Sequence, residues 1–196
     1  PLPPAMLEDN LDDVLAGAAN LRKHIEIVRE FGVSPVVALN VFPTDHPGEI
    51  DAVRKVAEAA GAHFASSTHV VDGGDGAIDL AHAVVAACDH KADFRYTYDL
   101  EDSLVEKLTK VATKVYGADG IDIAPAAAKE LAHFEDLGYG TFPVVIAKTH
   151  LSLSHDPSLK GAPTGWRLPV REVRAAVGAG YIYACLLYTS PSPRDS

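Results

Sequence analysis

A short apolar run that opens at Pro35 and stops at Asn40 most constrains how this chain can fold. Residues 36–39 read Val-Val-Ala-Leu, a segment of the kind that forms a buried strand in a parallel sheet. A polar turn that contains Pro43 follows, and a helical pattern begins near Pro47. This order of strand, turn and helix is typical of α/β folds, in which ligands bind at the carboxyl ends of the strands.

The turn after this strand is a candidate ligand site. Phe42, Pro43 and Asp45 supply an aromatic ring, a rigid apolar ring and a carboxylate, which together can form a stacking shelf for a flat ligand. Asp45 can orient a ligand amine, or it can cap the helix that follows. A plain turn between strand and helix is the alternative interpretation.

The rest of the chain alternates between helical and strand patterns. We expect helices over residues 7–31, 48–60, 77–88, 103–116, 125–137 and 170–177, and strands over residues 36–39, 63–65 and 143–147. A polar, aromatic connector over residues 89–100 predicts a boundary between two domains, residues 1–92 and 93–184. The predicted fold class is α/β, with a mainly parallel sheet flanked by helices and a second α/β subdomain.

Composition narrows the classes of function. The chain has 196 residues, 47% of them hydrophobic, and a formal net charge of −10. This acidic balance argues against nucleic acid or a membrane surface as partner, and no apolar run is long enough to span a bilayer. Two cysteines and nine scattered histidines lack metal-ligand spacing, so we expect no metal centre. Cys88 reads as a buried small residue, and the cysteine usage suggests a reducing, cytoplasmic location.

The end of the chain differs in composition from the rest. Residues 185–196 have no helical or strand period, and the codons that spell residues 185–195 can be those of a sequencing-library adapter. We therefore expect residues 185–196 to be a non-native tail, translated from an adapter joined to a truncated reading frame. A genuine Ser/Pro tail is the alternative.

A glycine-rich turn precedes the helix expected from residue 77. The backbone N–H groups of Gly73, Gly74 and Gly76 can cradle an anion. The turn lacks the Gly-Lys-Ser/Thr ending of a P-loop, and the nearby carboxylates of Asp72 and Asp75 repel phosphate. A tight turn between two elements is the alternative.

A second candidate site follows the strand expected over residues 143–147. Lys148 can neutralise the charge of a phosphate, with the hydroxyls of Thr149, Ser152 and Ser154 as further donors. A solvated loop over residues 148–165 is the alternative.

Five blocks of the sequence, taken in order, resemble formate–tetrahydrofolate ligase (10-formyltetrahydrofolate synthetase). They are residues 20–26, 40–45, 114–120, 137–154 and 170–181. The second block carries an Asn-x-Phe-x-Thr-Asp element and the fourth a Lys-Thr-x-x-Ser-x-Ser element. Five ordered blocks are far more specific than any single motif.

The resemblance implies an ATP-dependent ligase that joins formate to tetrahydrofolate through formyl phosphate, giving 10-formyltetrahydrofolate. It implies ATP with Mg²⁺ on a P-loop that lies upstream of the region present here, assistance by a monovalent cation, small-molecule substrates and a homo-oligomer when intact. The fold expected from it is a partial P-loop-NTPase-like fold that lacks its P-loop. We therefore expect an inactive fragment of such an enzyme; a non-catalytic α/β binding or interaction remnant is the alternative.

The resemblance also assigns a folate pocket. In the family, the aromatic residue of the Asn-x-Phe element and a tryptophan placed three residues before a Gly-Gly pair sandwich the pterin ring. Phe42 matches the aromatic residue, with Pro43 and Asp45 beside it, whereas Val70 stands at the tryptophan position. Valine offers apolar contact without a stacking face, so folate binding is expected to be weaker or differently shaped.

The same resemblance gives Lys148, Thr149, Ser152 and Ser154 a place in phosphate contacts or in the wall of the active site. It assigns no catalytic residue within this chain.

Overall fold

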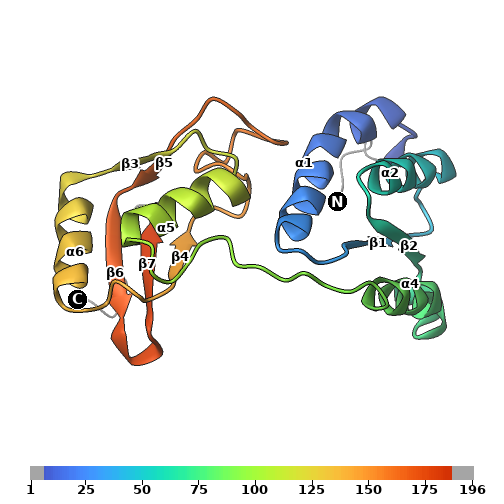
Figure 1. The fold of residues 1–196 in the computed structure, drawn as a ribbon. Helices are drawn as coiled ribbons and strands as arrows, with labels where there is room; N and C mark the ends of the chain where they lie inside the picture. The colour runs from blue at the N-terminus through green and yellow to red at the C-terminus, as the bar shows by residue number, and fades with distance from the viewer. Residues whose placement is uncertain (1–6, 187–196) are drawn as a thin grey trace. The chain divides into compact units, whose positions relative to one another are not determined.

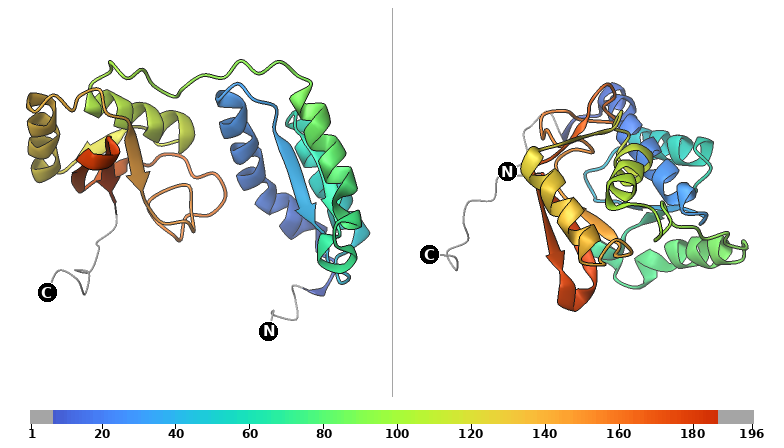
Figure 2. Two further views of the ribbon diagram at one scale, coloured as in Figure 1. Left: turned by 90° about the horizontal axis from the view of Figure 1, so that it is seen from below. Right: turned by 60° about the vertical axis from the view of Figure 1, so that its left-hand side comes forward.

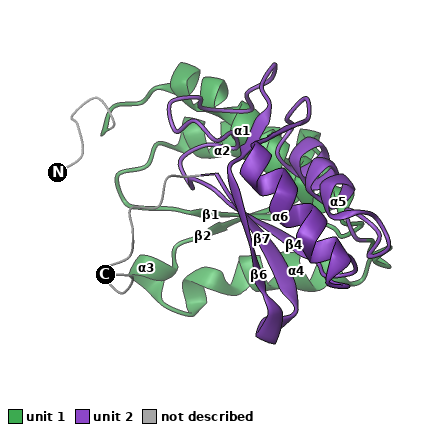
Figure 3. Ribbon diagram, turned by 90° about the vertical axis from the view of Figure 1, so that its left-hand side faces the viewer, with its two compact units in different colours: residues 1–95 green, residues 96–196 purple. Residues whose placement is uncertain are grey.

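The computed structural model describes residues 7–186, which divide into two compact units between Arg95 and Tyr96 (Figure 3). The boundary was expected after residue 92, within the connector. Three of the four strand pairings in the described residues are parallel, as expected for a mainly parallel α/β protein. They form three small sheets rather than one large one. No helix in the described part of the chain is both long and apolar enough to cross a membrane.

Unit 1 is built on a two-stranded parallel sheet. Its elements are α1 (Leu11–Glu30), β1 (Val36–Asn40), α2 (Pro47–Ala59), β2 (His63–Ser67), α3 (His69–Asp72), a 3-10 turn (Asp75–Ala77) and α4 (Ile78–Cys88). Helices α1 and α2 pack against each other on one side of the strands, and α4 lies on the other side (Figure 1).

The core of unit 1 is small. Ile25 of α1, Ala57 of α2 and Ala62 are buried, and Val37 of β1 and Phe64 of β2 pack against them. This core covers only part of the strands, so β1 is not the fully buried strand that its sequence predicts: its residues are half-buried or exposed. The alternation of parallel strands and helices still forms, because each segment has the length and the hydrophobic period of the helix or strand that it becomes.

One further expectation for unit 1 was wrong. Cys88 was expected to be buried and is exposed, because the only residue of α4 that is buried in the described structure is Ala87.

A glycine fixes the end of α1. Gly32 has a φ of +73°, which favours glycine, and a Cβ at this position would lie 1.7 Å from the carbonyl oxygen of Asp93. The amide of Asp93 donates to the Gly32 carbonyl at 3.0 Å. The connector can therefore lie this close to the end of α1 only because position 32 is a glycine.

Unit 2 contains most of the buried core. Its elements are α5 (Leu104–Lys110), a π-helical turn (Val111–Val115), β3 (Ile121–Ile123), α6 (Pro125–Asp136), β4 (Val144–Ala147), β5 (Leu168–Val170), β6 (Glu172–Ala176), a 3-10 turn (Val177–Ala179) and β7 (Tyr181–Cys185). Strand β3 pairs with β5, and β7 lies between β4 and β6. Strands β6 and β7 form an antiparallel hairpin (Figures 1 and 2).

The helix expected over residues 170–177 is absent. Valines at positions 170, 173 and 177 have helical spacing, but residues 172–176 form β6 and pair with β7. In this strand Val173 is buried while its neighbours Glu172 and Arg174 are exposed, which is the period of a strand. The pairing with β7 therefore outweighs the local helical pattern.

The structure also defines strand β7, which carries the chain into the region expected to be a tail. Cys185 pairs with Ala147 of β4, and Leu186 is buried in the core of unit 2. The folded unit therefore continues past residue 184. The remaining residues of the expected tail, 187–196, lie outside the described part of the chain, and their origin in an adapter stays a prediction.

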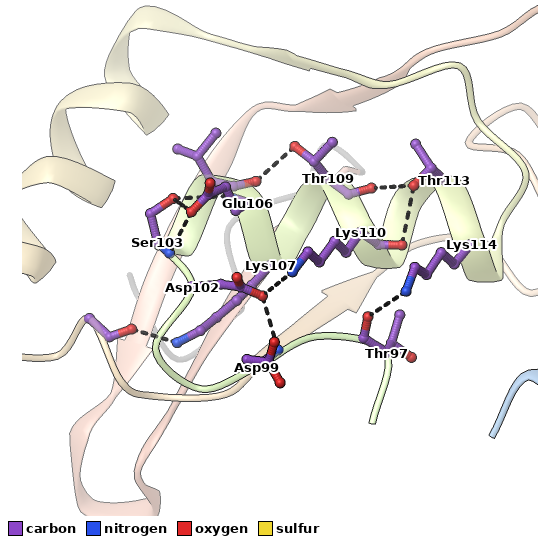
Figure 4. A network of polar contacts seen from close by, with 12 residues as sticks. Thr97, Asp99, Asp102, Ser103, Glu106, Lys107, Thr109, Lys110, Thr113 and Lys114 are labelled. Carbon is purple, nitrogen blue, oxygen red and sulfur yellow. Dashed lines mark hydrogen bonds and ion pairs between the residues drawn. The ribbon is translucent and has the colours of Figure 1, made fainter. Parts of the chain in front are cut away.

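Polar contacts fix the start of α5 (Figure 4). Ser103 and Glu106 form a capping box at its beginning, which satisfies two backbone donors that the helix leaves unpaired. The ammonium of Lys110 lies 2.5 Å from the carboxylate of Asp102. After Lys110 the helix widens into the π-helical turn, a feature found often near functional sites.

Candidate functional site

The candidate folate shelf lies in unit 1, where β1 and β2 end. The two strands are parallel and in register, with Asn40 opposite Ser67. The amide of Val41 donates to the Ser67 carbonyl at 2.9 Å, so the pairing continues one residue past the strands. The segments that follow, from Phe42 and from His69, therefore leave the same edge of the sheet.

The turn after β1 holds Phe42 in an exposed position. The backbone amide of Phe42 donates to Oδ2 of Asp45 at 2.9 Å, and the amide of Asp45 donates to the Phe42 carbonyl at 3.0 Å. Phe42 is 46% exposed, and Pro43 is also exposed. Asp45 does not cap α2, because His46 is the N-cap of that helix. Asp45 closes the turn that carries the ring, and its role toward a ligand amine stays a prediction.

The segment after β2 brings further groups to this edge. Val70 is 56% exposed on α3, as a residue in contact with a ligand must be. Ser67 is buried, and its hydroxyl lies 2.9 Å from Nδ1 of His69. His69 was not among the residues expected from the sequence. Its position just after the end of β2 is the one feature of the sequence that could have pointed to it.

The glycine-rich turn has the geometry of a tight connection. The amide of Thr68 donates to the Gly76 carbonyl at 3.0 Å, and the amide of Gly73 donates to the His69 carbonyl at 3.0 Å. A Cβ on Gly76 would lie 2.6 Å from the Thr68 hydroxyl and 2.7 Å from its carbonyl carbon. In this turn backbone packs on backbone, as expected for a tight turn between two elements.

The second candidate cluster lies in unit 2, in the segment that follows β4. We call residues 148–160 the serine loop. The ammonium of Lys148 donates to the carbonyl oxygens of Thr149 at 3.0 Å and Ser154 at 3.3 Å, and also to that of Ser152. All four expected residues therefore meet in one loop.

The hydroxyls of this loop are engaged within it. Oγ of Ser152 lies 2.9 Å from Oγ of Ser154, and the Ser154 hydroxyl donates to the Asp156 carbonyl at 3.0 Å. The Thr149 hydroxyl accepts from the amide of Leu151 at 3.2 Å. These bonds make the loop compact without any helix or strand.

Tyr116 belongs to this cluster although the sequence did not single it out. Nζ of Lys148 lies 4.9 Å from the centroid of the Tyr116 ring, within the range of a cation–π interaction. Burial lowers the pKa of Lys148 and raises the pKa of Tyr116, because desolvation disfavours the charged form of each group. Tyr116 directly follows the π-helical turn, which ends α5 and so places the ring.

Among residues 7–186 no group of three or more His, Cys, Asp or Glu side chains could hold a metal ion.

Comparison with known proteins shows the family of the chain. The model of the formate–tetrahydrofolate ligase family matches residues 3–191. The chain belongs to the formate–tetrahydrofolate ligase family. The resemblance seen in the five sequence blocks is thereby confirmed.

Named relatives are similar over nearly the whole of this chain. The formate–tetrahydrofolate ligase of Cutibacterium acnes is 98% identical over 94% of the chain, and that of Saccharopolyspora erythraea is 60% identical over 94%. The cytoplasmic C-1-tetrahydrofolate synthase of Saccharomyces cerevisiae is 49% identical over 94%. The chain spans 33% of the length of each bacterial ligase and 20% of the yeast protein.

Proposed function

We propose that this chain is part of an ATP-dependent ligase that joins formate to tetrahydrofolate and gives 10-formyltetrahydrofolate through formyl phosphate. The observation that carries the proposal is the match to the family over residues 3–191, together with 98% identity to the Cutibacterium acnes ligase. The alternative of a non-catalytic remnant is not favoured, because these relatives are named as ligases.

The complete enzyme uses ATP with Mg²⁺, and a monovalent cation assists it. It acts on small molecules as a cytoplasmic homo-oligomer. The name of the yeast relative supports the location.

Within unit 1, Phe42, Pro43, Asp45 and Val70 form the folate side of the active site. The exposed ring of Phe42 offers its face to the pterin, and such stacking contributes about 0.5–1.5 kcal/mol beyond the burial of area. Asp45 holds the turn that presents this ring. Val70 supplies apolar contact from α3.

Within unit 2, Lys148, Thr149, Ser152 and Ser154 form part of the active-site wall. Of the two roles expected for Lys148, the wall is the better supported, because three backbone carbonyls accept from its ammonium. A lysine ammonium has three N–H donors, so none is left over for a phosphate.

Assay of two proteins tests this function. The 196-residue chain contains no Gly-x-x-x-x-Gly-Lys-Ser/Thr element, so it should form no 10-formyltetrahydrofolate from ATP, formate and tetrahydrofolate. The full-length Cutibacterium acnes ligase should form it under the same conditions. Product from the chain alone contradicts the fragment proposal, and no product from the full-length protein contradicts the activity.

A further inference from the structure

The ammonium of Lys148 is the point on which the serine loop converges. Its three backbone acceptors, the carbonyls of Thr149, Ser152 and Ser154, all come from the six residues that follow it. The Tyr116 ring lies beside the same group. Only the charged form of lysine has the three N–H donors that this arrangement uses.

Carbonyl groups that converge on one position repel each other, because the negative ends of their dipoles meet there. A cation among them turns repulsion into attraction, and bonds from a charged donor are stronger than bonds between neutral groups. Residues 148–160 form no helix or strand that would satisfy these carbonyls. The shape of the loop therefore depends on a positive charge at this point.

We infer that Lys148 is a positioning residue, the tethered cation that folds the serine loop and holds Ser152 and Ser154 in place. The burial of Ser154 and its bonds to Ser152 and Asp156 follow from that fold. The effect of the loop on catalysis rests on the proposed function, whereas the folding of the loop on Lys148 does not.

Trp166 reports on this loop. It is the single tryptophan of the chain and is 6% exposed. Its ring centroid lies 5.9 Å from that of His155 in the loop. Opening of the loop removes this neighbour and exposes the indole to solvent.

The first test compares two lysine variants of the 196-residue chain. In Lys148→Met, amide hydrogen exchange over residues 149–159 should be about ten- to a hundredfold faster, the effect of losing a hydrogen bond to a charged group. Iodide should also quench Trp166 more strongly. Lys160→Met is the matched control, because Lys160 is an exposed lysine of the same loop with one bond, to the Leu151 carbonyl at 3.1 Å. Equal exchange in both variants and the wild type overturns the inference.

Chemical rescue keeps the test valid if Lys148→Met does not fold. In Lys148→Ala, propylammonium supplies the atoms that were removed, including the ammonium. Propylammonium should restore slow exchange over residues 149–159, and 1-propanol, which lacks the charge, should not. Rescue by both compounds, or by neither, overturns the inference.

Lys148→Met in the full-length Cutibacterium acnes ligase separates this inference from the proposed function. Faster amide exchange in the serine loop together with a lower kcat supports both the role of Lys148 and the proposed function. An inactive wild-type ligase contradicts the proposed function and leaves the exchange result to decide the role of Lys148. A wild-type kcat in a variant whose loop exchanges faster overturns the link between the loop and catalysis.

Discussion

The carboxylate of Asp45 accepts a 2.9 Å hydrogen bond from the backbone amide of Phe42, so an acid three residues along the chain sets the position of the ring. Asp45→Ala removes this bond. It should destabilise unit 1 by about 0.5–1.5 kcal/mol, the net value of such a bond at the surface. In the full-length ligase it should raise the KM for tetrahydrofolate and leave that for ATP nearly unchanged. Urea unfolding and steady-state kinetics measure the two effects.

Asp45→Asn is the matched control, because the amide keeps an acceptor oxygen at the same place. It should behave much like the wild type. If both substitutions have equal effects, the charge of Asp45 causes them, and the hydrogen bond that closes the turn does not.

Phe42→Ala tests the ring itself. Because Phe42 is half-exposed, its removal should change the stability of unit 1 little while it raises the KM for tetrahydrofolate. Phe94→Ala is a suitable comparison: Phe94 is also exposed, but its ring stacks on Phe31 at the end of α1. An unchanged folate KM in Phe42→Ala rules out stacking on the pterin.

Val70→Trp tests the position at which this chain departs from its family. The exposed Val70 leaves room for an indole, so the substitution should add a second stacking face and tighten folate binding. If the site has closed over valine, overpacking should instead cost about 1–3 kcal/mol of stability. Val71→Trp, at the next position of α3, controls for a nonspecific gain from an added indole. Titration of the full-length variants with folate separates the outcomes, and equal affinities place Val70 outside the pocket.

Asp102 gives unit 2 a stability that depends on pH. The hydrogen bond from Lys110 lowers the pKa of Asp102 from its ordinary value of 3.8. The contribution of the Asp102 carboxylate to the free energy of unfolding is therefore complete above pH 3.8, and it is lost as the pH falls through the lower, folded-state pKa. Asp102→Asn should reduce stability at pH 7, and its difference from the wild type should shrink below pH 3.8. Urea unfolding across this pH range checks the prediction. A stability difference between variant and wild type that does not depend on pH excludes the ion pair as its cause.

Lys107 is a fully buried lysine that α5 directs at the turn before β4. Its ammonium donates to the carbonyls of Gly140 at 2.5 Å and Phe142 at 3.1 Å. Lys107→Met keeps the apolar stem but leaves both carbonyls without this donor, and should cost about 1.5–3 kcal/mol. Lys129→Met, at an exposed position of α6, should stay within about 0.5 kcal/mol of the wild type. Calorimetric or urea unfolding compares the two, and equal stabilities mean that burial of the charge cancels its bonds.

Much of the fold was readable from local pattern. The helices over residues 11–30, 47–59 and 125–136 and the strands over residues 36–40 and 144–147 lie where periodicity, prolines and glycines predicted them. The strands β3, β5, β6 and β7 were not predicted. Strand β3 pairs with β5 and strand β7 pairs with β4; these partners lie far away in the sequence, and no local pattern carries that information.

The sequence by itself determined the family and the edges on which the two candidate clusters lie, because these depend on residue types in a fixed order along the chain. Only the tertiary structure decided what the side chains do there. It directed Asp45 to its own turn, joined His69 to Ser67, and enclosed the Lys148 ammonium in three carbonyls. The physical reason is that a side chain binds whichever acceptor or donor the folded backbone brings within about 3 Å, and that choice depends on the path of the chain through space.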